Sequence, residues 1–405
     1  MRHRPARIRT AATAGIAVAV ALLSFAPGVA SAGLAGPDNG ALTLAVFGDA
    51  PYGTSPTDTA QFDATPRFVD SVNADPDVSG IVHVGDIHSG KQFCTQPYDR
   101  SVLDLWTRFL DPLVYTPGDN EWADCHKQAE GGGTYNPATG QIDYATDAEG
   151  QPIDYAVGNP DANLALVRSM FFAQPGRTLG RHSMPVLSQA TVHDAAHPSD
   201  PKYVENVLWE RRGIVFVTLN IPGGSNNDAD VWYGAPTASA EQAQEQHDRT
   251  GADLRWLDRA FATAQADEAR SVVVIEQADM WDLDGKAVSH LTNYDPFVQS
   301  LADHAAAFGR PVLLFNGDSH AFRSDNPLQA TAPCFAENTT PATCSDWANH
   351  TAADGQGFDV PNFHRVTVHG STSPMEWLKL TISSDGHLPS SADGFGPFSW
   401  QRMAQ

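Results

Sequence analysis

Short apolar runs alternate with stretches of helical spacing in the first part of the chain. Each run has the length of a buried strand and ends in glycine and a polar residue. Apolar residues recur at helical spacing over Thr65–Asn73 and Val102–Leu110. The order strand, loop, helix, strand predicts a βαβ sheet. The strands predicted here are Leu42–Val46, Gly80–Val84 and Leu113–Thr116.

The later part of the chain continues this mixture of helices and strands, without a clear linker. We therefore predict one domain, residues 33–405, that contains two sheets. The tail after Ser383 is predicted to be irregular. Further helices are predicted at Asn163–Phe172, Ala238–Ala266 and Phe297–Phe308. Further strands are predicted at Gly213–Asn220, Ser271–Ile275, Val312–Phe315, His364–His369 and Trp377–Ile382.

Residues 127–163 interrupt this pattern. They are rich in glycine, aspartate and tyrosine and have no helical periodicity. Residues 140–145 nearly repeat as 150–156, which predicts a hairpin of two similar strands joined by an acidic turn. An insertion beside a candidate site often covers it, although a mobile flap without a role fits the same pattern.

The first 32 residues have the features of a secretory signal peptide. Arginines precede an apolar run, Ala11–Phe25, and the small residues Ala30-Ser31-Ala32 follow it. The run is short for a membrane anchor, so we expect cleavage after Ala32 and a secreted, extracellular protein. A retained single-span anchor is the alternative. No later segment is apolar enough to cross a bilayer.

The chain is strongly acidic, with 48 Asp and Glu against 25 Lys and Arg and a net charge of −23. Loss of the four arginines of the signal peptide would make the charge −27. Such a surface repels nucleic acid and anionic lipid, so we expect neither as a partner. It favours divalent cations, although most of these carboxylates are expected to form a solvated face.

Four cysteines in an exported chain predict disulfides. We favour the local pairing among the three possible connectivities. Their spacing is too wide for a typical thiolate metal site. The expected pairs are Cys94 with Cys125 and Cys334 with Cys344.

Acidic turns follow four of the predicted strands. Gly48-Asp49, Gly85-Asp86, Gly118-Asp119-Asn120-Glu121 and Gly317-Asp318-Ser319-His320 each place an oxygen donor just after a strand end. Ligands of open α/β sheets bind beyond the carboxyl ends of the strands. Carboxylates gathered there would repel one another unless a cation lies between them. The pattern therefore predicts a metal site.

In this order the turns resemble the motifs of the calcineurin-like metallophosphoesterase superfamily, which includes the purple acid phosphatases. The family pattern is D-x-H, G-D-x-x, G-N-H-[DE], a lone His after a strand, and G-H-x-H. The resemblance covers about residues 41–325 and points to a divergent secreted bacterial branch. It implies an α/β fold, a four-layer α-β-β-α sandwich of two mixed sheets flanked by helices.

Several histidines of the family pattern are replaced. Pro51 stands at the first, Gln277 or its neighbour Glu276 at the lone His, and Asp318 at the first His of the last motif. In the direct register Asp119 takes the ligand position and Asn120 that of the phosphate-contacting His, whereas a slip of one residue keeps Asn120 as the ligand. The implied first set is Asp49, Asp86 and His320. The implied second set is Asp86, Asp119 or Asn120, Gln277 and Asp318.

Two divalent cations are implied, and the second set is rich in oxygen donors. Such donors suit Mn²⁺, Mg²⁺ or Ca²⁺ better than Zn²⁺. The first set is short of one ligand, which Tyr52 or water would supply.

The implied reaction is hydrolysis of a small phosphate ester by a metal-activated water. We expect Asn120, His126 and His320 to form the catalytic group. Asn120 would donate its amide to phosphate, and His126 would protonate the leaving group. His88 and Asn226 are predicted substrate contacts.

The main alternative is a catalytically impaired calcineurin-fold protein that serves as an extracellular binding or scaffold protein. The missing histidines favour it, whereas the ordered carboxylates favour the enzyme, because an inactive site has no reason to keep unpaired charges together. Single aspartates of this kind also serve as helix caps or turn formers. The acidic charge argues against a nuclease. The sequence leaves the natural substrate and the oligomeric state open.

Overall fold

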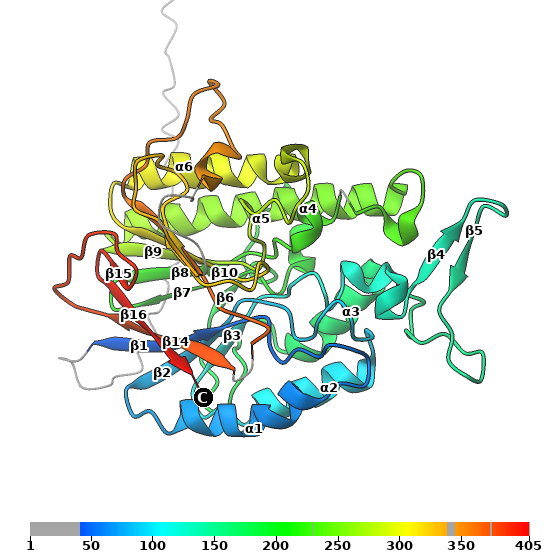
Figure 1. Cartoon of the computed structure of the whole chain (residues 1–405). Coiled ribbons are helices and arrows are strands. Elements are labelled where there is room, and N and C mark those ends of the chain that lie inside the picture. Colours follow the sequence, from blue (N-terminus) through cyan, green and yellow to red (C-terminus); the bar gives the residue numbers. More distant parts are fainter. Residues whose placement is uncertain (1–40, 229, 338–344, 373–374, 405) are drawn as a thin grey trace, which may run out of the picture. The chain divides into compact units, whose positions relative to one another are not determined.

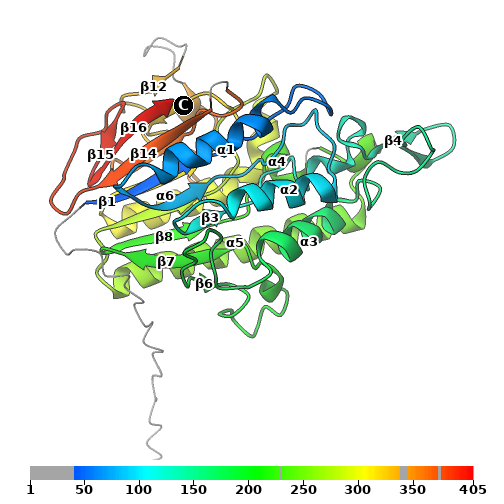
Figure 2. The same cartoon turned by 90° about the horizontal axis from the view of Figure 1, so that it is seen from below.

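The computed structural model describes residues 41–228, 230–337, 345–372 and 375–404 (Figures 1 and 2). They belong to one compact unit, Ala35–Gln405. The predicted signal peptide and Cys344, the expected partner of Cys334, lie outside the described residues. Within those residues, every helix is too short or too polar to cross a bilayer.

The first sheet has six strands in the order β15-β16-β14-β1-β2-β3. β1, β2 and β3 run parallel, as the βαβ pattern predicted; β14 pairs antiparallel with β1, and β16 pairs antiparallel with β14. The strands are β1 (Leu42–Phe47), β2 (Val78–His83), β3 (Leu113–Tyr115), β14 (Glu376–Ile382), β15 (Gly394–Phe395) and β16 (Phe398–Ala404).

The second sheet has eight strands in the order β12-β11-β13-β10-β9-β8-β7-β6. Its centre is parallel, from β8 through β9 and β10 to β13, and both edges are antiparallel. The strands are β6 (Leu187–Ser188), β7 (Val207–Arg211), β8 (Ile214–Thr218), β9 (Ser271–Ile275), β10 (Val312–Asn316), β11 (Arg323–Asp325), β12 (Phe335–Ala336) and β13 (Phe363–Thr367).

The helices flank the two sheets (Figure 1). α2 begins where the hydroxyl of Thr95 accepts the Tyr98 N–H, and α6 ends at Gly309, whose φ of 65° suits glycine. The α-helices are α1 (Ala60–Asn73), α2 (Gln96–Trp106), α3 (Pro160–Phe171), α4 (Gly223–Asp228), α5 (Ala240–Ala266) and α6 (Asp295–Phe308). Short 3₁₀ turns span Asp124–His126, Gln128–Glu130, Asp200–Lys202, Trp232–Gly234, Val288–Tyr294 and Asp346–Ala348.

Alternation along the strands builds the layers, because successive side chains point to opposite faces of a sheet. Leu44 and Val46 of β1 meet Val273 and Ile275 of β9 in a core between the sheets. The outer face of the first sheet packs under α1, α2 and α3, and that of the second under α5 and α6. The order helix, sheet, sheet, helix confirms the predicted four-layer sandwich.

Two local predictions were wrong. The insertion does contain a hairpin, but β4 (Gly133–Asn136) pairs with β5 (Gln141–Tyr144), upstream of the predicted partners. Residues 151–153 make only a bridge and single hydrogen bonds back to 145–147. The tail is not irregular, because β15 and β16 complete the first sheet and bury Phe398 and Trp400.

The predicted disulfide between Cys94 and Cys125 is confirmed. Both residues are buried. The bridge ties the loop after β2 to the loop after β3, the two loops that carry Asp86 and Asp119.

Candidate metal centre

The predicted metal ligands follow the carboxyl ends of five strands, β1, β2 and β3 of the first sheet and β9 and β10 of the second. Main-chain contacts join their loops. The N–H of Asp49 donates to the Gly85 carbonyl, and the N–H of Gly317 donates to the Gln277 carbonyl, both at 2.9 Å. The distant turns therefore meet at one edge of the sandwich, as their positions after strands predicted.

The backbone at four of these residues is left-handed, a conformation that is uncommon for residues other than glycine. Such strain persists where the surrounding structure holds it, and it concentrates at functional sites. The φ values are 48° at Asp49, 61° at Asp86, 71° at Asp318 and 60° at His320.

Asp49, Asp86 and His320 form a compact set of ligand atoms. One ligand atom from each lies within 4.8 Å of the other two. Nε2 of His320 is 3.6 Å from Oδ1 of Asp49. Both aspartates are buried, and Asp86 and His320 border the cleft described below. The convergence on which the metal prediction depended is confirmed.

The hydroxyl of Tyr52 lies among these groups. It donates to Oδ2 of Asp86 at 2.5 Å and lies 3.3 Å from Nε2 of His320. Burial, followed by the charge of Asp86, raises the pKa of Tyr52, so that the hydroxyl keeps its proton. Tyr52 thus lies where the sequence placed a candidate for the missing ligand of the first set.

The set fits a divalent cation. Oδ2 of Asp49 is buried and has no hydrogen-bond partner. Burial raises the pKa of Asp49 and Asp86 well above the ordinary carboxyl value, and the charge of Asp119 adds to this. Burial lowers the pKa of His320 to about 4, which leaves the neutral imidazole that metal ions bind. A cation between these groups would relieve the desolvation of the carboxylates.

Asp119 and Asp318 form a second group beside the first. A Cβ atom added to Gly223 would lie 2.4 Å from Oδ2 of Asp119 and 2.8 Å from Oδ1 of Asp318. Burial, and then the charge of Asp124, raises the pKa of Asp119 to about 7. Of the residues that the structure describes, only Asp49, Asp86 and His320 form a three-ligand set. The second group provides two carboxylates.

Gln277 lies beside this pair, but its oxygen is already engaged. Oε1 accepts the Gly223 N–H at 2.6 Å, and Nε2 donates to Oδ1 of Asp119 at 3.1 Å. The amide therefore orients Asp119, and the Gly223 N–H already occupies one lone pair of its oxygen. This arrangement differs from the ligand role that the sequence predicted.

The side chain of Asn120 points toward the first set. Its Nδ2 donates to Oδ2 of Asp86 at 3.0 Å and to the Tyr52 hydroxyl at 2.9 Å. An amide nitrogen donates hydrogen bonds and does not ligate cations. The geometry therefore favours the direct register, with Asp119 at the ligand position and Asn120 as a donor.

A cleft of about 490 Å³ opens over both groups. This volume is within the usual range for small-molecule sites. Its lining includes Tyr52, Asp86, Asp119, Asn120, Asp318 and His320.

Three predicted catalytic or substrate residues are buried and do not line the cleft. Nδ1 of His126 accepts the Tyr233 N–H at 3.0 Å, and burial lowers the pKa of His126 to about 4. His88 packs against Tyr98, and Asn226 contacts Arg249. Their positions do not support the general-acid role of His126 or the substrate contacts of His88 and Asn226.

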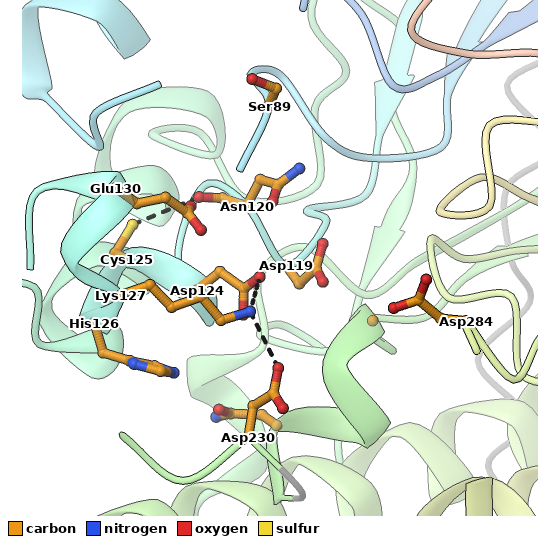
Figure 3. Close-up of polar contacts among 12 residues, drawn as sticks. Ser89, Asp119, Asn120, Asp124, Cys125, His126, Lys127, Glu130, Asp230 and Asp284 are labelled. Atoms are coloured by element: carbon orange, nitrogen blue, oxygen red, sulfur yellow. Dashed lines mark hydrogen bonds and ion pairs between the residues drawn. The ribbon is translucent and has the colours of Figure 1, made fainter. Parts of the chain in front are cut away.

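Two groups of charged residues at the cleft were not among the residues predicted from the sequence. Lys127 pairs with Asp124 at 2.5 Å and with Asp230 at 3.1 Å (Figure 3). Asp279 receives a hydrogen bond from the Ser319 hydroxyl and pairs with the buried Arg365. Asp279 follows the predicted strand Ser271–Ile275, so its position after a strand could have identified it. Its partners Ser319 and Arg365 come from distant segments, and no sequence pattern pointed to these contacts.

The sequence model of the family described as calcineurin-like phosphoesterase matches residues 42–322. A solved structure, that of purple acid phosphatase PPD1 from yellow lupin (Lupinus luteus) seeds, is similar at 12% identity and a TM-score of 0.37. The match covers 85% of this chain and 50% of the lupin chain, so the protein spans about half the length of the lupin phosphatase. No curated protein matches.

Proposed function

The chain belongs to the calcineurin-like phosphoesterase family, and from this premise we propose that it is a secreted, metal-dependent phosphoesterase that hydrolyses small phosphate esters. The observation that carries the proposal is the convergence of Asp49, Asp86 and His320 at a cleft, with one buried carboxylate oxygen of Asp49 left without a partner.

Asp49, Asp86 and His320 would hold one divalent cation, and Asp119 and Asp318 would contribute to a second. Bound cations would acidify water and offset the charge of a phosphate. Carboxylate donors favour Mn²⁺, Mg²⁺ or Ca²⁺ over Zn²⁺ at the second position.

The chain's own groups would orient the substrate. The amide of Asn120 reaches the cleft and can donate to a phosphate oxygen, as the resemblance implied. It already donates to Asp86 and Tyr52, so a phosphate would share or replace those contacts. An amide cannot serve as a general acid.

The secreted location is part of the proposal. The first 32 residues have the pattern of a signal peptide, and the buried disulfide between Cys94 and Cys125 suits an oxidising compartment. A strongly acidic surface argues against nucleic acid as a substrate.

The second candidate is a binding or scaffold protein of the same fold. It is favoured by Gln277, whose oxygen accepts the Gly223 N–H, so the second position has few free ligands. A site that holds a single cation and turns over no ester would fit this alternative.

Hydrolysis of p-nitrophenyl phosphate and of its bis ester separates the two functions. We expect turnover by the purified protein, its loss after treatment with a chelator, and recovery with Mn²⁺ or Mg²⁺ to a higher rate than with Zn²⁺. The ratio of the two rates gives the preference for mono- or diesters. Turnover that survives complete removal of metal would contradict the metal-dependent mechanism. Absence of turnover with every cation would favour the scaffold.

A further inference from the structure

The segment that follows β8 carries an unusual turn beside the second carboxylate pair. In the element labelled α4, Gly224, Ser225, Asn226 and Asn227 are all left-handed, with φ between 60° and 62°, so it is not a regular right-handed helix. Three of these four residues carry side chains, for which this conformation is costly. Contacts from outside the turn must therefore hold it.

Arg249 of α5 provides the main contacts. Its side chain is fully buried, and Nη1 donates to Oδ1 of Asn226 at 2.5 Å. Nη2 donates to the Asn226 carbonyl at 3.1 Å, and Nη1 also donates to the Asn220 carbonyl at 3.0 Å. The planar guanidinium thus binds the turn through both its side chain and its main chain.

Glu245, one helical turn before Arg249, completes this support. Its Oε1 pairs with Nε of Arg249 at 2.7 Å, and its Oε2 accepts from Nδ2 of Asn227 at 2.8 Å. Gln242 donates from Nε2 to the Asn227 carbonyl at 3.1 Å. Three buried polar residues of α5, Gln242, Glu245 and Arg249, therefore form hydrogen bonds with the turn.

The turn reaches the second carboxylate pair through Gly223. The Gly223 N–H is bonded to Gln277, whose amide donates to Asp119, and the Gly223 backbone lies against Asp119 and Asp318. The Arg249 guanidinium also lies 5.3 Å from the ring centre of Trp122, and the main-chain N–H of Trp122 donates to the Asp119 carbonyl. Two routes thus link Arg249 to Asp119.

We propose that Arg249 is a positioning residue that holds the 223–227 turn, and with it the Gly223 backbone against Asp119 and Asp318, and so fixes the spacing of the second cation position. This inference rests on the proposed function. It also assigns Asn226 to the support of the turn, in place of the substrate contact that the sequence suggested.

The test is a titration of the metal-free protein with Mn²⁺, followed by calorimetry and by electron paramagnetic resonance of free Mn²⁺. The variant Glu245→Gln/Arg249→Met removes both buried charges together, so that neither is left unpaired. We expect the wild type to bind two ions and the variant to bind the second ion about 10–100-fold more weakly, the range for groups that orient ligands. Affinity for the first ion should change less than threefold.

Asn226→Gly provides a second variant that does not depend on how well the first one folds. Glycine accepts the left-handed conformation, so the variant loses the side-chain acceptor Oδ1 for Nη1 of Arg249 without added strain and keeps the main-chain carbonyl that accepts from Nη2. We expect the same selective loss at the second position. The matched control is Asp200→Asn/Arg255→Met. It removes another bidentate pair that involves α5, in which Arg255 donates to Asp200 at 2.9 and 2.5 Å and makes no bond to the turn. This variant should bind both ions normally.

Three results would overturn the inference: normal second-ion affinity in Asn226→Gly, equal weakening of both ions, or a wild type that binds only one ion. The proposed function fails separately, if the wild type binds no ion and hydrolyses no ester.

Discussion

Asp86→Asn is expected to lower kcat/KM for p-nitrophenyl phosphate by about 10²–10³-fold, a range typical for loss of one group that stabilises transition-state charge. Asp86 lies at the centre of the site, in contact with Tyr52 and Asn120 and grouped with Asp49 and His320. Asparagine has nearly the same shape but no charge. The change therefore tests the charge with little change in packing.

The stability of this variant should move in the opposite direction. Burial raises the pKa of Asp86 well above its ordinary value, so the carboxylate is costly in the metal-free protein. We expect the metal-free variant to melt at the same temperature as the wild type or higher, and to gain less from added Mn²⁺. A trade of stability for activity is common at functional sites.

Asp99→Asn is the matched control. Asp99 is also buried, and burial raises its pKa, but it does not line the cleft. Its variant should keep normal kcat/KM. If Asp86→Asn stayed within threefold of the wild type, the assignment of Asp86 as a shared ligand would be wrong.

Removal of the disulfide, with Cys94→Ser/Cys125→Ser, should lower the free energy of unfolding by about 2–5 kcal/mol. The bridge closes a segment with a sequence separation of 31 and constrains the unfolded chain. The sulfur atoms of Cys94 and Cys125 lie 3.3 and 3.6 Å from the Asn120 carbonyl oxygen. Loss of the disulfide should therefore also loosen the loop after β3.

Urea denaturation followed by circular dichroism measures this effect. Thr95→Ala is a suitable control, because it removes the N-cap of α2 next to Cys94 but leaves the bridge intact. Loss of an N-cap costs about 1 kcal/mol. Equal stability losses in the two proteins would show that the bridge contributes little beyond local packing.

The parts of the fold that the sequence predicted are those with a local signal. Buried strands appear in the sequence as short apolar runs, and a Gly-Asp pair after four of these runs marks the strand end. Because parallel strands place their carboxyl ends on one edge of a sheet, the acidic turns were expected to gather at strand ends. The grouping of Asp49 and Asp86 with His320, which follows a strand of the other sheet, came from the resemblance to the family. No knowledge of side-chain contacts was needed.

The remainder depends on contacts between distant segments. Gln277 is a residue type that can ligate a metal ion. In the structure, however, its side-chain oxygen accepts the N–H of Gly223, which lies 54 residues earlier in the chain. In the sequence, nothing distinguishes Arg249 from the other polar residues of its helix. Its role becomes visible only from its contacts with the 223–227 turn. In the tail, Gly394, Gly396 and Pro397 obscure the alternation that makes β15 and β16 strands. Periodicity carries no information about such partners.

The most direct test of the metal centre is anomalous diffraction from crystals of the full chain grown with Mn²⁺. We predict a strong manganese peak bounded by Asp49, Asp86 and His320. Manganese bound only at exposed acidic residues such as Asp284, with none among these three side chains, would contradict it.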